Sequence, residues 1–331
     1  MKFIKWLGLI LLVLIVLYFL GPRPKPPVYD VKLPEVPAAG GLDKFVAAEE
    51  AQHKLKPDNE ARIIWANDSL KQVTEYAVVY LHGFSASQEE GDPVHEFFAK
   101  QFNCNLYLSR LDGHGIDTTE PLMTMTADGL WNSAKEAYAI GKQLGKKVII
   151  IGTSTGGTLA LKLAAEYPEI AGLILLSPNI EINDNLAWIA NNHWGLQIAR
   201  MVKGKYNDYH DTITLDNKYW FNKYRMEAVT ELQELLETTM KASLFEKIRQ
   251  PTLLLYYYKD EEHQDPQVRV SAMKRMFRQL STPDSLKREV AIPNADAHVI
   301  GSYIKSKDVQ SVERECAQFG EQIMHLNSPM P

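Results

Sequence analysis

The chain has 331 residues, 45% of them hydrophobic, which is enough for one large domain with a subdomain. The formal net charge is −5 and no long basic run is present, so the sequence argues against a nucleic-acid partner. The two cysteines, Cys104 and Cys316, are too few for a zinc finger. We expect two buried free thiols, although the sequence leaves a disulfide between them open.

The first expected element is an apolar helix over residues 3–20, interrupted only by Lys5. Eighteen helical residues at about 1.5 Å each extend roughly 27 Å, close to the core of a bilayer. We therefore expect residues 1–21 to be a membrane anchor, with the following domain on the outer (periplasmic or extracytoplasmic) side. The alternative is a signal peptide and secretion after its cleavage, but residues 19–22 lack the small-residue cleavage pattern.

Residues 22–37 contain six prolines. Proline-rich segments are extended and stiff because each ring fixes its own backbone angle. We expect residues 22–40 to be a tether that holds the domain away from the membrane.

From residue 41 onward, helical and strand-like segments alternate. The expected strands are 61–66, 76–81, 104–109, 146–151, 171–176, 252–258 and 286–292, and the expected helices are 42–53, 93–102, 127–144, 158–165, 268–280 and 308–325. Several of the strands are apolar throughout, as in a parallel sheet that is buried on both faces. The pattern predicts an α/β fold whose mostly parallel sheet is covered by helices on both sides.

Residues 180–245 interrupt this alternation and contain no clear buried strand, so we expect an inserted, mainly helical cap. The cap is rich in aromatic residues: Trp188, Trp194, Tyr206, Tyr209, Tyr219, Trp220, Phe221 and Tyr224. Such rings would exclude water and offer apolar surface to a substrate. The alternative is that they only pack the cap onto the sheet.

A G-x-S-x-G sequence, Gly152 to Gly156, lies between the strand 146–151 and the helix that follows it. A serine on so tight a turn has a strained backbone, and its hydroxyl projects above the edge of the sheet. Ser154 is therefore our predicted nucleophile. The amide of Thr155 is then one expected donor of an oxyanion hole.

The base that activates such a serine is expected late in the chain. His298 follows the last expected strand, at the sheet edge where Ser154 lies, and is our predicted base. The acid that orients it should follow the strand 252–258, where both Asp265 and Asp260 qualify. We favour Asp265 because the valines after it can pack and hold its carboxylate rigidly, and we keep Asp260 as the alternative.

The second oxyanion donor is expected in the turn His82-Gly83-Phe84, directly after the strand 76–81. Gly83 allows a ligand to approach the backbone closely, so the amide of Phe84 is our prediction. For His82 we expect a structural role in ordering this turn.

These motifs resemble those of serine hydrolases with the α/β-hydrolase fold, and in particular the bacterial carboxylesterase and monoacylglycerol lipase group. The resemblance rests on the HGF turn (82–84), RLDGHG (110–115), GTSTGG (152–157) and the late His298, and it extends from about residue 61 to 325. It implies a cap inserted after the sixth strand of the fold. Two features depart from the pattern: the spacing of the acid after the strand 252–258, and a short leading hairpin.

The predicted organisation is an anchor (1–21), a tether (22–40), a hydrolase domain (41–325) with its cap at about 180–245, and a disordered tail (326–331). The predicted activity is hydrolysis of carboxylic esters through an acyl-enzyme, on a small and amphiphilic or lipid-derived ester. The alternatives are acyl transfer by the same residues, or a non-catalytic, membrane-tethered binding domain. No cofactor or metal is expected, and the oligomeric state stays open.

Overall fold

The computed structural model describes residues 2–209 and 214–327. Its centre is a seven-stranded sheet in the order β1-β3-β2-β4-β5-β8-β9. The strands are β1 (Arg62–Ile64), β2 (Thr74–Leu81), β3 (Asn105–Leu108), β4 (Gly145–Thr153), β5 (Gly172–Leu176), β8 (Thr252–Tyr256) and β9 (Lys287–Ala291). All neighbouring strands run parallel except β1, which is antiparallel to β3. The expected α/β class and mostly parallel sheet are confirmed.

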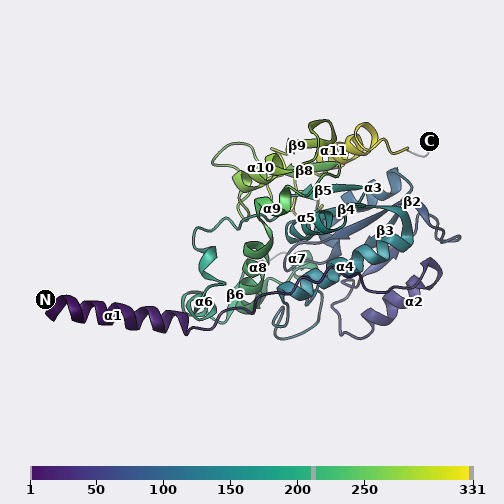
Figure 1. Cartoon of the computed structure of the whole chain (residues 1–331). Coiled ribbons are helices and arrows are strands. Elements are labelled where there is room, and N and C mark those ends of the chain that lie inside the picture. Colours follow the sequence, from purple (N-terminus) through teal and green to yellow (C-terminus); the bar gives the residue numbers. More distant parts are fainter. Residues whose placement is uncertain (1, 210–213, 328–331) are drawn as a thin grey trace.

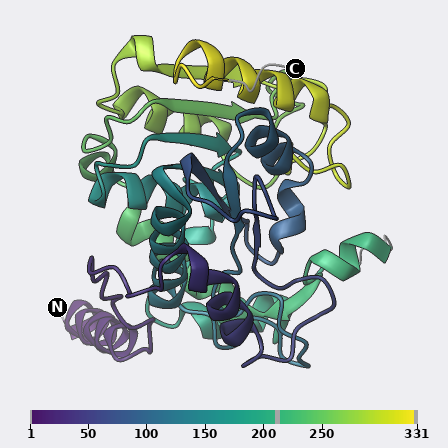
Figure 2. The ribbon, with the colours of Figure 1, turned by 90° about the vertical axis from the view of Figure 1, so that its right-hand side faces the viewer.

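Helices cover both faces of the sheet (Figures 1 and 2). One face packs against α2 (Ala39–Glu50), α4 (Ala127–Leu144), α5 (Thr155–Glu166) and α10 (Val270–Gln279), and the other against α3 (Val94–Gln101) and α11 (Val309–Gln322). Val148 to Ile151 of β4 supply apolar side chains to both layers, alternating between them. This alternation is the reason that an all-apolar strand can be buried on both faces.

Side-chain caps begin two of the covering helices. The Thr126 hydroxyl accepts a hydrogen bond from Gly129 N at the start of α4, and the Asp308 carboxylate accepts one from Ser311 N at the start of α11. Each cap satisfies an amide that the first turn of a helix leaves without a partner. Helix α4 has the predicted bounds, whereas the other expected helices differ from the observed ones by a few residues at their ends.

The insertion lies between β5 and β8 and is mainly helical, as expected. It contains the short 3-10 helix η2 (Ala187–Ile189), α6 (Gly195–Lys203), α7 (Thr214–Tyr219), α8 (Met226–Thr239) and α9 (Ala242–Phe245). It also contains an antiparallel pair that we did not predict, β6 (Tyr206–Asp208) and β7 (Lys223–Arg225). In chain order the insertion follows the fifth strand of the sheet and not the sixth, as the resemblance implied. The reason is that a single strand, β1, precedes β2.

The expectation of an N-terminal transmembrane anchor is wrong. Within the described part of the chain, no helix combines the length and the apolar content that a membrane crossing requires. Helix α1 (Lys2–Phe19), the apolar helix of this segment, does not meet this requirement. The predicted membrane contact and the outer-side location depended on this anchor and are dropped with it.

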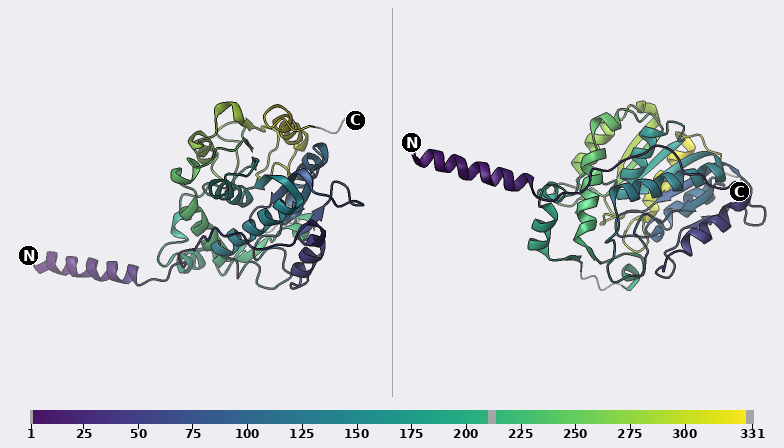
Figure 3. Two further views of the ribbon diagram at one scale, coloured as in Figure 1. Left: turned by 45° about the vertical axis from the view of Figure 1, so that its right-hand side comes forward. Right: turned by 60° about the horizontal axis from the view of Figure 1, so that its bottom comes forward.

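Helix α1 projects from the rest of the protein in all views (Figures 1 and 3). Its end contacts the insertion, because the Trp194 indole donates a hydrogen bond of 3.0 Å to Leu17 O and the His193 ring lies 5.3 Å from that of Tyr18. The proline-rich segment that follows is extended but lies against the domain. The Trp131 indole donates to Asp30 O (2.7 Å) and the Tyr167 hydroxyl to Val31 O (2.6 Å).

The two cysteines are free and buried, which agrees with the expectation of buried thiols. Cys104 lies just before β3 and Cys316 on α11. Of the predicted tail, residues 328–331 lie outside the described residues.

Candidate active site

Ser154 lies at the turn between β4 and α5 and has a φ of 52°, a left-handed conformation that is strained for a residue with a side chain. The two glycines of the motif make this turn possible. A Cβ atom on Gly156 would lie 1.9 Å from Leu81 O, and one on Gly152 would lie 2.5 Å from Gly156 O. The close approach of α5 to β2 therefore requires glycine at position 156, and that of α5 to the end of β4 requires it at position 152.

Three backbone hydrogen bonds hold the strained residue in place. Ser154 N donates to Leu176 O (3.0 Å), and Ser154 O accepts from Thr158 N (3.1 Å) and Asn179 N (2.9 Å). The turn is thus bound to the end of β5 as well as to its own helix. Ser154 is 7% exposed, so its side chain lies in a nearly closed environment.

His298 and Asp265 form a buried pair. His298 lies in the loop after β9, Asp265 in the loop after β8, and His298 Nδ1 lies 2.6 Å from Asp265 Oδ2. The second oxygen of Asp265 accepts hydrogen bonds from Gln267 N (2.9 Å) and Val268 N (3.0 Å), which fix the carboxylate. Burial lowers the pKa of His298, but the charge and hydrogen bond of Asp265 outweigh burial and hold that pKa above its ordinary value.

The structure places Asp260, the alternative acid, away from His298. Its carboxylate accepts hydrogen bonds from His263 Nδ1 and His263 N, both at 2.8 Å, within an exposed turn. The bond to His263 lowers the pKa of Asp260. Of the two predicted acids, Asp265 is the one that contacts His298.

The turn 82–85 is held by neighbouring side chains. His82 Nε2 accepts a hydrogen bond from Leu111 N, and His114 Nε2 accepts one from Ser85 N, both at 3.0 Å. Burial lowers the pKa of His82 and brings that of His114 to about 4, so both rings are neutral acceptors at pH 7. The His114 contact fixes the peptide after Phe84. The peptide before it, which carries the predicted oxyanion donor, is fixed by the hydrogen bond between His82 Nδ1 and Gly83 O (2.8 Å).

Seven of the eight aromatic residues of the insertion fall into two groups, and Tyr206 is half-buried. Trp188, Trp194 and Tyr209 are exposed, whereas Tyr219, Trp220, Phe221 and Tyr224 are buried. The buried group meets the turn described above: Phe221 N donates to Ser85 O (2.7 Å), and the Tyr224 ring lies perpendicular to that of Phe84 at 5.0 Å. The buried rings thus line the approach to the turn and also pack the insertion onto the domain.

Sequence reasoning missed Glu90, a fully buried carboxylate beside the same turn. It belongs to the sequence Gln-Glu-Glu-Gly, which is typical of a solvated turn, so no local signal indicates burial. Burial raises the pKa of Glu90 to about 7, although the hydrogen bond from Gly83 N and the charge of His298 lower it.

One group of potential metal ligands occurs among the described residues. Side-chain atoms of Asp92, His95 and Glu96 lie within 4.8 Å of one another around the start of α3. Nε2 of His95 already contacts Gln88 O at 3.0 Å, and Glu96 is exposed. Exposed acidic groups of this kind are common without an ion, and we assign no ligand to them.

Comparison with known proteins agrees with this architecture. The family described as serine aminopeptidase, S33 (Hydrolase_4) matches residues 72–293. The chain belongs to this family. The match includes the turn of Ser154 and also Asp265, and it ends before His298. The resemblance to α/β-hydrolase-fold serine hydrolases is thereby confirmed.

Individual relatives of this hydrolase include lipases. A thermostable monoacylglycerol lipase from Bacillus sp. (strain H-257) is 29% identical over 189 residues, which cover 57% of this chain and 71% of the lipase. The structure reported for the metagenome-derived lipolytic enzymes LipS and LipT has a TM-score of 0.64 at 17% identity and covers 81% of this chain and all of its own. The structure of the monoacylglycerol lipase of Paleococcus ferrophilus has a TM-score of 0.56 at 13% identity. The match covers 81% of this chain and 98% of the lipase. At such identities the two structures establish the fold alone.

Proposed function

We propose that this hydrolase cleaves carboxylic esters, with Ser154 as nucleophile, His298 as general base and Asp265 as the residue that orients the base. The observation that carries the proposal is the buried His298–Asp265 hydrogen bond of 2.6 Å. The two residues follow parallel strands β9 and β8, so they lie at the carboxyl edge of the sheet, where β4 also ends at the serine.

The surroundings of Gly83 support the proximity of base and nucleophile. A Cβ atom on Gly83 would lie 3.1 Å from Ser154 Cβ and 2.8 Å from Glu90 Oε1, so both side chains border this glycine. Glu90 in turn interacts with the charge of His298. Ser154 and Glu90 thus border the same glycine, and the charge interaction between Glu90 and His298 supports our proposal that the imidazole lies on this side of the turn.

The proposed reaction follows from these roles. The Ser154 oxygen bonds to the ester carbonyl carbon while His298 accepts the proton of the Ser154 hydroxyl. Asp265 stabilises the imidazolium that forms. The oxyanion accepts hydrogen bonds from the amides of Phe84 and Thr155. His298 then donates the proton to the alcohol oxygen as the ester C–O bond breaks. The alcohol departs, and the acyl group remains bound to Ser154 as an acyl-enzyme. Water, activated by the same base, releases the acid and restores the serine.

The proposed substrate is a small amphiphilic ester, including lipid-derived ones. Buried rings of the insertion, Phe221 and Tyr224 among them, offer apolar surface near the turn that carries Phe84. The similarity to a monoacylglycerol lipase points in the same direction. The aromatic surface suits an acyl chain better than a charged group.

A fluorophosphonate probe tests the nucleophile. We expect the wild-type protein to be labelled stoichiometrically and Ser154→Ala to be unlabelled and inactive while it stays folded. Ser69→Ala, at an exposed serine, is the matched control and should keep labelling and turnover. A folded wild-type protein that resists the probe, or a Ser154→Ala variant that still turns over, would refute the proposal.

Nitrophenyl esters of graded acyl length, with amino-acid nitroanilides alongside, test the substrate class. We expect kcat/KM to be highest for esters of medium or longer chains. Preferential cleavage of the nitroanilides would instead favour a peptidase, the activity in the family's description. Product analysis with glycerol as a competing acceptor shows whether the acyl group passes to water or to an alcohol.

A further inference from the structure

Glu90 is a buried carboxylate for which the reaction proposed above has no use. It lies on the 3-10 helix η1 (Gln88–Gly91) and is 2% exposed. Its Oε2 accepts a short hydrogen bond from Gly83 N and lies 3.4 Å from the Tyr80 hydroxyl. Trp220, from the insertion, also interacts with this carboxylate and lowers its pKa. A buried carboxylate that accepts from a backbone amide and lies beside a hydroxyl acts as a fixed acceptor.

This carboxylate lies beside the predicted nucleophile. The space that a Cβ atom on Gly83 would fill is bordered by both carboxylate oxygens of Glu90, at 2.8 and 2.9 Å, and by Ser154 Cβ at 3.1 Å. Glycine at position 83 therefore allows the carboxylate to reach the backbone of the turn. The bond that results is to the His82–Gly83 peptide, which directly precedes the peptide that carries the Phe84 amide.

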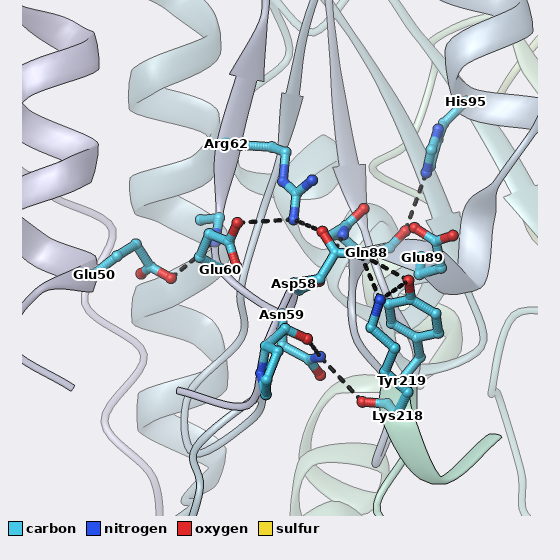
Figure 4. Close-up of polar contacts among 12 residues, drawn as sticks. Glu50, Asp58, Asn59, Glu60, Arg62, Gln88, Glu89, His95, Lys218 and Tyr219 are labelled. Atoms are coloured by element: carbon cyan, nitrogen blue, oxygen red, sulfur yellow. Dashed lines mark hydrogen bonds and ion pairs between the residues drawn. The ribbon is translucent and has the colours of Figure 1, made fainter. Parts of the chain in front are cut away.

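The helix that carries Glu90 is itself held in place (Figure 4). His95 Nε2 donates to Gln88 O (3.0 Å), and the Gln88 side chain donates to Asp58 O (3.2 Å). The Asp58 carboxylate accepts hydrogen bonds from the Tyr219 hydroxyl (2.7 Å) and Lys218 Nζ (3.0 Å) of the insertion. This network joins η1 to both the domain and the insertion, so Glu90 projects from a rigid base.

We propose, building on the function proposed above, that Glu90 is a positioning residue of the active site. It holds the Gly83 amide, and thereby the turn that presents the Phe84 amide, beside Ser154. An oxyanion donor stabilises the transition state only when it is held at the right distance before the reaction begins. When it is ionised, which its pKa of about 7 allows for about half of the molecules at pH 7, Glu90 also favours the imidazolium form of His298.

The charged and titratable groups around Glu90 are few. Tyr80 faces it from β2 and His298 from the loop after β9, with Asp265 behind the imidazole. Beyond Trp220, Lys305 lies over the indole at 5.3 Å and is paired with Asp216. His298 is the group of opposite charge that interacts with Glu90, so the loss of the Glu90 charge should be detected in the titration of His298.

Two substitutions separate the two roles of Glu90. Glu90→Ala removes both the acceptor and the charge, and we expect kcat to fall about 10- to 100-fold with KM changed less than about 3-fold. Glu90→Gln keeps an oxygen for Gly83 N and removes the charge. We expect it to retain kcat within about 5-fold at pH 8, and to move the acidic midpoint of kcat/KM down by roughly 0.5–1 pH unit.

Glu89→Gln is the matched control, because Glu89 lies on the same short helix and accepts a hydrogen bond from the Tyr303 hydroxyl. It should leave kcat and the midpoint unchanged. Wild-type kcat in a folded Glu90→Ala variant, or a Glu90→Gln profile that superimposes on the wild type, would overturn the inference. If Glu90→Ala does not fold, the acidic midpoint of kcat/KM in Glu90→Gln tests the inference: a lower midpoint supports it and an unchanged one overturns it.

Fluorophosphonate labelling at Ser154 keeps the two proposals apart. If the wild type is labelled and Ser154→Ala is inactive, the proposed function stands, and an unchanged Glu90→Gln profile then refutes only the role of Glu90. If Ser154→Ala retains turnover, the proposed function fails, and the role of Glu90 fails with it.

Discussion

Replacing Asp265 by asparagine tests the geometry of the proposed base most directly. The two oxygens of Asp265 have separate partners: Oδ1 accepts from two backbone amides, and Oδ2 contacts His298 Nδ1 at 2.6 Å. An asparagine can keep its oxygen on the amides and so preserve the loop. Its NH2 group then faces Nδ1, which must become an acceptor. The ring proton is forced onto Nε2, and the base can no longer accept a proton from the serine.

The expected loss can be bounded from these contacts. A hydrogen bond to a charged group contributes about 1.5–3 kcal/mol, so its loss alone would slow the reaction roughly 10- to 150-fold. The wrong tautomer adds to this, and in a serine protease the equivalent acid-to-amide change lowers kcat about 10⁴-fold. We therefore expect Asp265→Asn to lower kcat by about 10²- to 10⁴-fold, or about 2.7–5.4 kcal/mol.

The matched control is Asp260→Asn. The side chain of Asp260 is 51% exposed and pairs with His263, which is also exposed, so we expect a change in kcat below about 3-fold. Steady-state hydrolysis of a nitrophenyl ester gives both values, and circular dichroism shows whether each variant is folded. A larger loss in Asp260→Asn than in a folded Asp265→Asn variant would refute the assignment of the acid.

Three further outcomes follow from burial and close approach. Because the pKa of His298 is raised and its neutral form acts as the base, activity should fall as the pH drops through a midpoint above about 6.5, measured as kcat/KM against pH. Gly156→Ala should lower Tm by roughly 2–10 °C, because its Cβ would meet Leu81 O, and calorimetry measures this. Cys104, whose pKa burial raises to about 12, and Cys316 should react with a thiol reagent only after denaturation, as two thiols per chain.

The sheet could be predicted because its strands carry their own signal. The apolar run of β4 and the sequence of β2 indicate buried parallel strands without reference to their neighbours. Helix α4 was predicted with its observed bounds because its apolar spacing and Thr126 cap are both local. The pair β6 and β7 escaped prediction because three-residue strands have too short a pattern to detect.

The site could be predicted in part. The turn of Ser154 has a sequence signature, but the choice between Asp265 and Asp260 does not, since both follow β8 and only the folded chain shows which contacts His298. Glu90 has no signature at all: its burial depends on a glycine seven residues earlier in the chain. The apolar run at the N-terminus gave a wrong prediction: its length and apolar content suggested a membrane crossing, but the helix that forms there does not meet the requirement for one.

The turn 82–85 connects these observations. Its peptides are held by Leu111 through His82, by His114, by Glu90, and by the amide of Phe221. The last contact comes from the insertion, and Trp220 of the insertion also interacts with Glu90. The insertion is therefore part of the support of the proposed oxyanion donor as well as a cover over it. Because that support would act on the transition state, variation in the insertion should alter kcat and not only the choice of substrate.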